Sequence, residues 1–248
     1  MKILVCISHV PDTTSKINFT PDNKAFDING VQFVINPYDE FGLTRALWFK
    51  EKVGGSVTVL NVGTSTTEPT LRKALAIGAD DAIRIDAEPT DAFFVASQIA
   101  ATVQAEQYDL LIMGRESIDY NGAQVPGMVA ELLQWPFVNA CVGMEVDNGT
   151  AHCIREIDGG KETVEAKLPM VVAGQKGLVE EKDLRIPNMR GIMTARTKPL
   201  AVRAAVEADK RSQAVGYEKP AAKAAVTMVN ADNMDELVRL LHEEAKVI

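Results

Sequence analysis

The sequence predicts an α/β fold, in which a mostly parallel, twisted sheet carries helices on both faces in a doubly wound arrangement. Short apolar segments alternate with amphipathic ones along the first half of the chain, which is the pattern of such a sheet. Turn signals in the middle of the chain add an antiparallel hairpin excursion, and a tail with little apolar periodicity adds a C-terminal arm. A length of 248 residues suits one large domain with such an appendage.

Five short, apolar and largely β-branched runs are expected to form strands buried on both faces, since such strands do not alternate apolar and polar residues. They are residues 3–7, 57–62, 82–85, 110–113 and 170–173. Helical patterns lie between them at residues 41–52, 67–77, 91–107 and 123–134. This alternation predicts parallel strands, and ligands bind at the carboxyl ends of the strands in sheets of this kind. The loops expected at that edge are residues 8–14, 36–40, 63–67 and 114–122.

The middle of the chain has the pattern of an antiparallel meander. Residues 142–146, 151–157 and 163–167 alternate apolar and polar side chains, and Asn148-Gly149 and Asp158-Gly159 separate them. Asn-Gly and Asp-Gly are strong hairpin signals. We expect a further hairpin near the N-terminus, in which residues 16–19 pair with residues 26–35 around Asp22-Asn23.

The α/β domain is expected to span residues 1–196, and the arm residues 197–248. Residues 197–225 are rich in Ala, Lys and Glu, and an amphipathic helix follows at residues 233–246. One interpretation is an arm that packs on a partner chain. The other is a linker followed by a helix that packs on its own domain.

Composition excludes several classes of protein. The net charge of −8 argues against a non-specific nucleic-acid binder, and no apolar run is long enough to span a bilayer. Three cysteines without a C-x-x-C pair suggest neither a disulfide framework nor a zinc site. We expect a cytoplasmic protein with no targeting peptide, no metal and no catalytic residues, because neither a histidine cluster nor a nucleophile motif is present. Binding or electron transfer is favoured over bond chemistry.

Two loops at the expected carboxyl edge are candidate ligand sites. Asn36-Pro37-Tyr38-Asp39-Glu40 has the composition of a helix start, and it either caps that helix or faces a ligand. The loop from Gly114 to Gln124 follows a buried strand and precedes a helix, where free N–H groups can hold an anion. A purely structural loop remains the alternative, because the sequence is neither a G-x-G-x-x-G nor a Walker motif.

A basic segment with an apolar centre is unusual in this acidic chain. Ile186-Pro187-Asn188-Met189 lies among Arg185, Arg190, Arg196 and Lys198. It is either a solvated loop or a docking loop with an apolar anchor and a ring of charges that speeds encounter with an acidic partner.

Taken together, these stretches resemble the small (beta) subunit of the electron-transfer flavoproteins. The resemblance covers residues 1–200 in order and spacing. Its matching pieces are residues 2–7, 36–40, 71–80, 114–124, 135–136 and, most specifically, Arg155-Glu156-Ile157-Asp158-Gly159-Gly160 through Glu162 to 168–172. It implies an adenine-nucleotide-binding fold in a heterodimer with an alpha subunit, which holds most of the redox FAD. It further implies AMP in the small subunit, acyl-CoA dehydrogenases or similar flavoenzymes as electron donors in fatty-acid oxidation, and a membrane quinone reductase as acceptor.

The resemblance also implies roles for individual residues. The nucleotide would contact Cys6, Asn36, Pro37, Tyr38, Asp39, Val62, Gly114, Arg115, Glu116, Ser117, Ile118, Asp119, Tyr120, Asn121, Gly122, Ala123, Gln124 and Val125. Thr13 and Tyr38 would lie near the flavin, although an aromatic residue is usual at both positions and Thr13 departs from that pattern. Ile186, with Arg185, Pro187 and Asn188, would dock the electron donor, and Glu156 would orient the flavin domain.

Whether the nucleotide is AMP or a second FAD is left open by the residues. Asn36 to Glu40 resembles the AMP type, whereas the Ala-Gln-Val of residues 123–125 is shared with the bifurcating branch, in which a second FAD oxidises NADH. Pro126 also removes one backbone donor at the helix start. AMP is the preferred expectation. A third hypothesis, an adenine-nucleotide hydrolase or ligase, lacks a Walker loop and a metal-ligand cluster.

Overall fold

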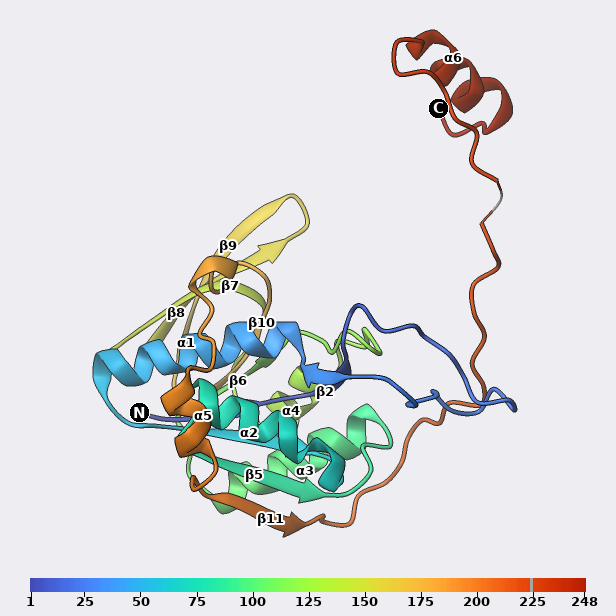
Figure 1. Ribbon diagram of the computed structural model, residues 1–248. Helices are drawn as coiled ribbons and strands as arrows, with labels where there is room; N and C mark the ends of the chain where they lie inside the picture. Colours follow the sequence, from blue (N-terminus) through green and yellow to red (C-terminus); the bar gives the residue numbers. More distant parts are fainter. Residues whose placement is uncertain (224) are drawn as a thin grey trace.

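The computed structural model describes residues 1–223 and 225–248, and it confirms the predicted α/β class (Figure 1). Its main sheet has the strand order β11-β5-β4-β1-β6-β10-β7-β8-β9, and β2 and β3 form a separate two-stranded sheet. The strands are β1 (Lys2–Cys6), β2 (His9–Pro11), β3 (Phe33–Ile35), β4 (Ser56–Val62), β5 (Asp81–Asp86), β6 (Leu110–Gly114), β7 (Phe137–Asp147), β8 (Thr150–Ile157), β9 (Gly160–Lys167), β10 (Met170–Gly174) and β11 (Leu200–Ala204). From β11 to β7 every neighbouring pair is parallel.

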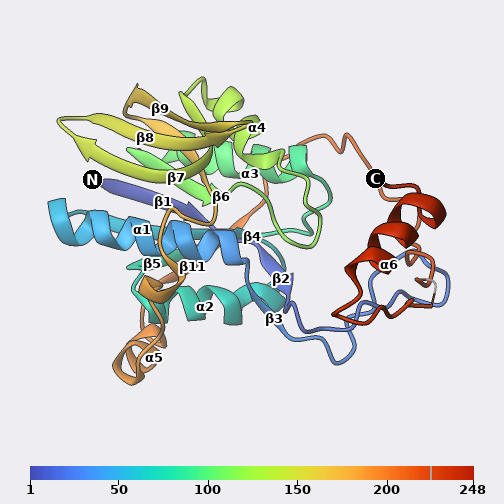
Figure 2. The ribbon, with the colours of Figure 1, turned by 90° about the horizontal axis from the view of Figure 1, so that it is seen from above.

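Helices cover both faces of this sheet, as the alternating pattern predicts. They are α1 (Pro37–Val53), η1 (Ser65–Thr67), α2 (Glu68–Ile77), α3 (Ala92–Ala105), α4 (Val125–Leu133), η2 (Glu181–Asp183), α5 (Met189–Ala195), α6 (Met234–Arg239) and the π-helical turn η3 (Leu240–Glu244). The apolar sides of α1 and α2 pack on one face, and those of α3 and α4 pack on the other (Figure 2). Helix α5 packs on α2.

Two cores result from the pleat of the parallel strands. Ile3 and Ile112 face the core under α1 and α2, while Leu4 and Leu111, one residue away, face the core under α3 and α4. All four side chains are fully buried. A strand with a core on each side needs apolar residues at every position, which explains the uninterrupted apolar runs of the sequence.

The strand order reverses direction at β1, and this reversal positions the ligand site. From β1 the chain builds outward through β4 and β5, and it then crosses to β6 on the other side of β1. The connections leaving the carboxyl ends of β1 and β6 therefore run to opposite faces of the sheet. Such a reversal leaves a crevice between them, at the edge where ligands bind in this class of fold.

The meander is confirmed, and the N-terminal hairpin needs a correction. Strands β7, β8 and β9 pair antiparallel, with turns at Asn148-Gly149 and Asp158-Gly159. In residues 12–32, the segment between β2 and β3 that we call the N-terminal excursion, a single bridge joins Phe19 to Phe26. Strand β3 pairs with β2 instead of with residues 16–19. A second turn interrupts the expected strand, because the Asp27 carboxylate accepts the Asn29 N–H at 3.1 Å and Gly30 has a φ of 72°.

The tail contributes to the sheet before it leaves the domain. Strand β11 pairs parallel with β5 from Leu200 to Ala204, so the sheet continues past residue 197, where we expected the arm to begin. Residues 205–223, which follow β11, contain no helix or strand, and α6 lies apart from the sheet (Figure 1). Over the residues that the structure describes, the helices lack the combination of length and apolarity that a bilayer span requires.

Replacing Leu111 by alanine tests the second core. Leu111 is fully buried between β1 and β10, so we expect Leu111→Ala to lower the free energy of unfolding by about 3 kcal/mol through lost burial and a residual cavity. Leu132 on α4 is 37% exposed, and Leu132→Ala should cost less than about 1 kcal/mol. Urea unfolding of both variants measures the difference, and equal losses would contradict this assignment of the core.

Candidate functional site

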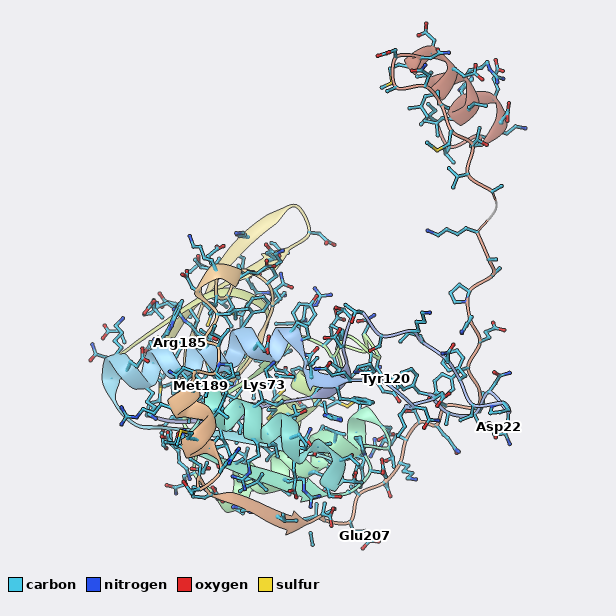
Figure 3. All side chains as sticks on the ribbon, in the orientation of Figure 1. Asp22, Lys73, Tyr120, Arg185, Met189 and Glu207 are labelled. Carbon is cyan, nitrogen blue, oxygen red and sulfur yellow. The ribbon has the colours of Figure 1, made fainter. Side chains whose placement is uncertain are left out.

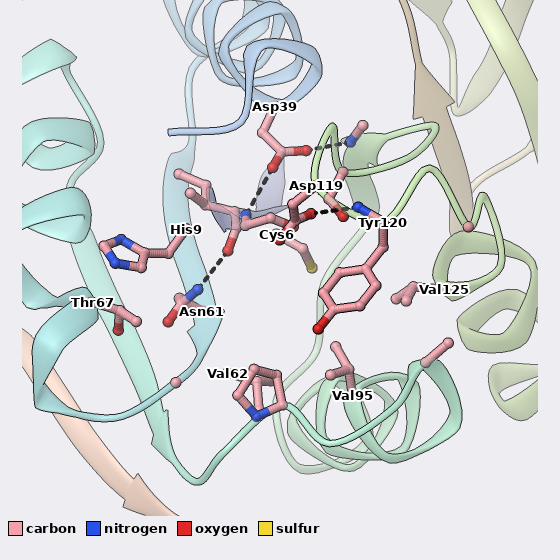
Figure 4. A pocket seen from close by; sticks show the side chains of 18 of the residues that line it. Cys6, His9, Asp39, Asn61, Val62, Thr67, Val95, Asp119, Tyr120 and Val125 are labelled. Carbon is pink, nitrogen blue, oxygen red and sulfur yellow. Dashed lines mark hydrogen bonds between the residues drawn. The ribbon is translucent and has the colours of Figure 1, made fainter. Parts of the chain in front are cut away.

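A cavity of about 1200 Å³ opens at the carboxyl edge of the sheet, where the strand order reverses (Figure 4). Cys6, Val62 and Gly114, at or next to the ends of β1, β4 and β6, form part of its floor. Val95 and Ile99 of α3 form an apolar side wall. A cavity of this size, apolar on one side and polar on the other, has the character of a small-molecule or cofactor site.

The carboxylate of Asp39 holds two of the loops around this cavity. Its two oxygens accept the N–H groups of Ser8 at 2.8 Å and of Gly114 at 2.7 Å, so the ends of β1 and β6 are tied to the first turn of α1. Gly114 is required there, because a Cβ at this position would lie 2.5 Å from Asp39 Oδ1. Burial raises the pKa of Asp39 to about 7, although the N–H groups of Ser8 and Gly114 favour the ionised form.

Asn36 stabilises the loop after β6 from a position outside the cavity lining. It is fully buried, its amide nitrogen donates to the Glu116 carbonyl at 2.9 Å, and its amide oxygen accepts the Ile118 N–H at 3.2 Å. The side chain makes no capping bond to α1, so the interpretation of Asn36 as a side-chain cap is wrong. Because its amide group bonds the backbone of residues 116 and 118, Asn36 fixes the shape of the loop, and it does not line the cavity.

The loop after β6 leads into a helix N-terminus that opens on the cavity. Gln124, Val125 and Pro126 line the cavity, and no side chain caps α4. Asn121 and Ala123 have φ values of 49° and 50°, a left-handed backbone that bends the loop around the cavity. The exposed N–H groups and the positive end of the helix dipole together favour an anionic group such as a phosphate.

The cavity brings together most of the residues that the resemblance assigns to a nucleotide. Thirteen of them line it: Cys6, Asp39, Val62, Gly114, Arg115, Glu116, Ser117, Asp119, Tyr120, Gly122, Ala123, Gln124 and Val125. Asn36, Pro37, Tyr38, Ile118 and Asn121 do not. Burial raises the pKa of the Cys6 thiol, so this side chain is neutral at pH 7 and acts as a wall rather than as a nucleophile.

His9 and Phe33 form a further part of the wall. Residues 8–14 were expected at this edge of the sheet, but His9 was not assigned to a ligand and Phe33 was missed. Their rings stack at 4.4 Å, and His9 Nδ1 lies 2.8 Å from the Thr70 hydroxyl. Burial lowers the pKa of His9, with the charge of Asp119 opposing, so the imidazole is neutral at pH 7. Lys73 also lines this side and pairs with Glu40 at 2.9 Å. The pairing of β2 with β3 creates this wall, and no local pattern in residues 9–11 or 33–35 signals it.

A chain of hydrogen bonds joins this cavity to a second, smaller one of about 390 Å³ that Tyr38, Glu156, Gln175 and Lys176 line. Arg115, in the wall of the large cavity, donates to the Gln175 side-chain oxygen at 3.0 Å. The Gln175 amide in turn donates to the Glu156 carboxylate. Tyr38 and Glu156 thus share the second cavity, whereas Thr13 is exposed in the excursion and lines neither.

The basic segment presents an apolar surface. Ile186 and Met189 are 79% and 77% exposed, and Met189 lies with Arg185 on the side of the domain that α1 and α5 form (Figure 3). Arg185 pairs with both carboxylate oxygens of Glu51 at 2.8 and 3.0 Å, so it is not a free charge. Asn188 caps α5 by accepting the Gly191 N–H at 2.7 Å. Among the residues that we expected to dock a partner, Ile186 is thus an exposed apolar side chain, while Arg185 and Asn188 hold the segment in place.

Comparison with known proteins decides the family. The sequence pattern of the electron transfer flavoprotein domain matches residues 24–208, which is most of the chain. The chain belongs to the electron transfer flavoprotein family. It is 37% identical to the electron transfer flavoprotein subunit beta of Syntrophomonas wolfei, over 91% of this chain and 88% of that protein. It is 31% identical to the proteins of the same name from Bacillus subtilis, over the full length of both chains, and from Mus musculus, over 100% of this chain and 99% of that one.

The resemblance to the beta subunits of electron transfer flavoproteins is thereby confirmed.

Among the described residues, no three His, Cys, Asp or Glu side chains gather as metal ligands would, and His9, His152 and His242 lie in β2, β8 and η3. What the arrangement offers chemically is a binding cavity with a helix N-terminus at one end and apolar walls.

The titration of Asp39 provides a test of this geometry. Because its pKa is raised to about 7 in the folded state, the folded protein retains a proton that the unfolded chain releases near pH 4. The contribution of Asp39 to the stability of the wild type should therefore fall as the pH rises from about 4 to about 7 and level off above. In Asp39→Asn the amide group must face one of the two N–H donors, which costs about 1–3 kcal/mol and removes the titration.

Urea unfolding at a series of pH values measures both effects. The difference in unfolding free energy between wild type and Asp39→Asn should be largest near pH 4 and narrow toward pH 7. Asp158→Asn, at an exposed turn, is the matched control and should leave the profile unchanged. A difference that does not vary with pH would contradict the raised pKa.

Proposed function

We propose that this chain is the small subunit of a heterodimeric electron carrier of the bacterial cytoplasm, in which it binds AMP as a structural ligand. It has no catalytic residues of its own in this proposal. It supports the FAD domain of an alpha subunit, docks acyl-CoA dehydrogenases or related flavoenzymes, and passes electrons on to a respiratory quinone reductase, for example in fatty-acid oxidation. Its relatives carry the name of electron transfer flavoprotein subunits, which fits a carrier rather than an enzyme.

The observation that carries the nucleotide assignment is the cavity at the reversal of strand order. Its uncapped helix N-terminus suits a phosphate, and the apolar wall of Val62, Val95 and Ile99 suits a purine ring. Gly114 and its contacts with Asp39 keep the backbone close to the ligand space. These residues would hold the adenylate, and bound FAD of the alpha subunit would supply the redox chemistry.

A second candidate is the bifurcating type, in which this subunit holds a second FAD and the complex oxidises NADH. The size of the cavity favours it: about 1200 Å³ lies above the usual range for small-molecule sites, which is roughly 300–1000 Å³. The cavity also reaches His9 and Phe33 of the two-stranded sheet.

Tyr38 and Glu156 support the placement of the alpha subunit's flavin domain. Both line the smaller cavity. The hydrogen bond that the Gln175 amide donates holds the Glu156 carboxylate against this subunit's own α/β domain rather than leaving it free in solvent. We assign to Glu156 the role of holding the flavin domain between its open and closed arrangements, and to the residues beyond the sheet, including α6, the role of an arm on the alpha subunit. The exposed apolar residues Met234, Val238 and Ile248 fit such an arm.

The nucleotide content of the purified heterodimer tests the proposal. We expect one FAD and one AMP per dimer after acid denaturation and chromatographic separation of the released nucleotides. Two FAD per dimer, together with bleaching of flavin by NADH, would replace the AMP proposal with the bifurcating one. One FAD with no adenylate would contradict a nucleotide site in this subunit.

The docking role of Ile186 has its own test. Ile186→Ala removes most of a side chain that is 79% exposed, so the fold is unaffected while the anchor for the electron donor is lost. We expect electron transfer from the dehydrogenase to slow by about tenfold, since an anchor at the centre of an interface contributes more than roughly 1 kcal/mol.

Stopped-flow reduction of the heterodimer by the dehydrogenase measures this rate, and the AMP content should remain unchanged. Ile154→Ala on β8, where Ile154 is 43% exposed, is the matched control for losing a surface isoleucine. Equal rates for Ile186→Ala and wild type would show that the segment is ordinary surface.

A further inference from the structure

A short stretch of the tail covers the large cavity. Residues 211–217, which we call the strap, follow β11 and run from the N-terminus of α3 to the N-terminal excursion (Figure 1). Ser212, Gln213, Ala214 and Tyr217 line the cavity together with residues 6–126. The strap is therefore part of the cavity wall, although it lies far along the chain from every other residue in that wall.

One end of the strap is held by Asp91 at the rim of the cavity. Asp91 Oδ2 accepts the N–H groups of Arg211 at 2.6 Å and of Ser212 at 2.8 Å. Its other oxygen, Oδ1, accepts the Phe94 N–H at 2.8 Å and so caps α3. One carboxylate thus fixes both the start of α3 and the start of the strap. The Arg211 guanidinium also lies 3.8 Å from the centre of the Phe93 ring.

The other end is held by the N-terminal excursion. The ring of Tyr217 stacks on Phe19 at 5.3 Å, and the Tyr217 N–H donates to the Asn23 carbonyl at 2.8 Å. Two residues on, Lys219 donates to the Asn18 side chain at 2.7 Å. Ile28 and Val31 of the same excursion line the cavity. The strap therefore bridges two opposite rims, one on α3 and one on the excursion.

We propose that the strap is the outer wall of the adenine-nucleotide site and sets how slowly the nucleotide leaves. This inference rests on the proposed function, in which the cavity holds AMP. The strap contacts at both ends must break before the cavity opens on that side, because Ser212 to Tyr217 lie over it. Opening requires the loss of the hydrogen bonds to Asp91 and of the stacking on Phe19. The closed strap, and not deep burial alone, therefore slows the departure of the nucleotide.

Asp91→Asn separates the strap from the fold of α3. Asparagine is as good an N-cap as aspartate, so its amide oxygen keeps the bond to the Phe94 N–H. Its amide nitrogen then faces the N–H donors of Arg211 and Ser212, and both strap bonds are lost. Asp209→Asn, an exposed position just before the strap, makes the same change of charge and is the matched control.

The experiment uses the heterodimer with its bound nucleotide. Wild type, Asp91→Asn and Asp209→Asn are incubated with excess ¹⁴C-labelled AMP, and incorporation is followed over time after gel filtration. We expect exchange about tenfold faster in Asp91→Asn, as the loss of roughly 1–1.5 kcal/mol of hydrogen bonding implies. Exchange in Asp209→Asn should equal that of the wild type.

Tyr217→Ala tests the other anchor and should speed exchange to a similar extent, without touching Asp91 or α3. Wild-type rates in both Asp91→Asn and Tyr217→Ala, with one AMP per dimer, would overturn the role of the strap and leave the proposed function intact. A wild-type heterodimer that contains no AMP would overturn both.

Discussion

The buried carboxylate of Asp39 is the constraint on which the site depends. It sits in the first turn of α1, yet both of its oxygens are used by backbone N–H groups at the ends of β1 and β6. Those two strands mark the point where the sheet reverses direction, and their loops would otherwise be free to separate. A neighbouring amide, Asn36, fixes the second of these loops two residues further on. The first turn of α1 thus sets the shape of the crevice at the carboxyl ends of β1, β4 and β6.

This arrangement also joins the large cavity to the smaller one that Tyr38, Glu156, Gln175 and Lys176 line. Arg115 is held in the wall of the cavity, and Gln175 connects it to Glu156 on the meander. The three side chains come from the loop after β6, the end of β10 and the end of β8. In the proposed heterodimer, the residue that orients the flavin domain is therefore held by the same loop that encloses the nucleotide. A change in that loop would reach Glu156 through two hydrogen bonds.

Much of the fold was predictable because its strands are buried on both faces. Uninterrupted apolar runs such as residues 110–113 leave no other arrangement, and the Asn148-Gly149 turn defines the meander. The separate pairing of β2 with β3 was not predictable, because it depends on a contact between residues 9–11 and 33–35 rather than on a local pattern. Strand β11 was missed for a related reason: it is an edge strand with polar neighbours, and it is recognisable only once β5 is in place.

In the candidate site, too, residues with a local role were predictable and residues placed by tertiary contacts were not. Residues whose role is local, such as those of the loop from Gly114 to Val125, were expected at the cavity and line it with few exceptions. Asn36 was expected either to cap α1 or to contact a ligand, and it instead bonds residues 80 positions away. Phe33 and the strap were missed because they reach the cavity only through tertiary contacts.

The position of the strap in the chain has a consequence for synthesis. The other residues that line the cavity end at Pro126, and the strap begins at Arg211, 85 positions later. At about 5–20 residues per second, the ribosome needs roughly 4–17 s to cover that interval. During this time the ribosome has already made the residues of the cavity floor and the start of α4. The strap, which forms the outer wall, has not yet been made. In the proposed role of the strap, a nucleotide that binds before the tail is complete would be covered by the strap only once residues 211–217 have been made.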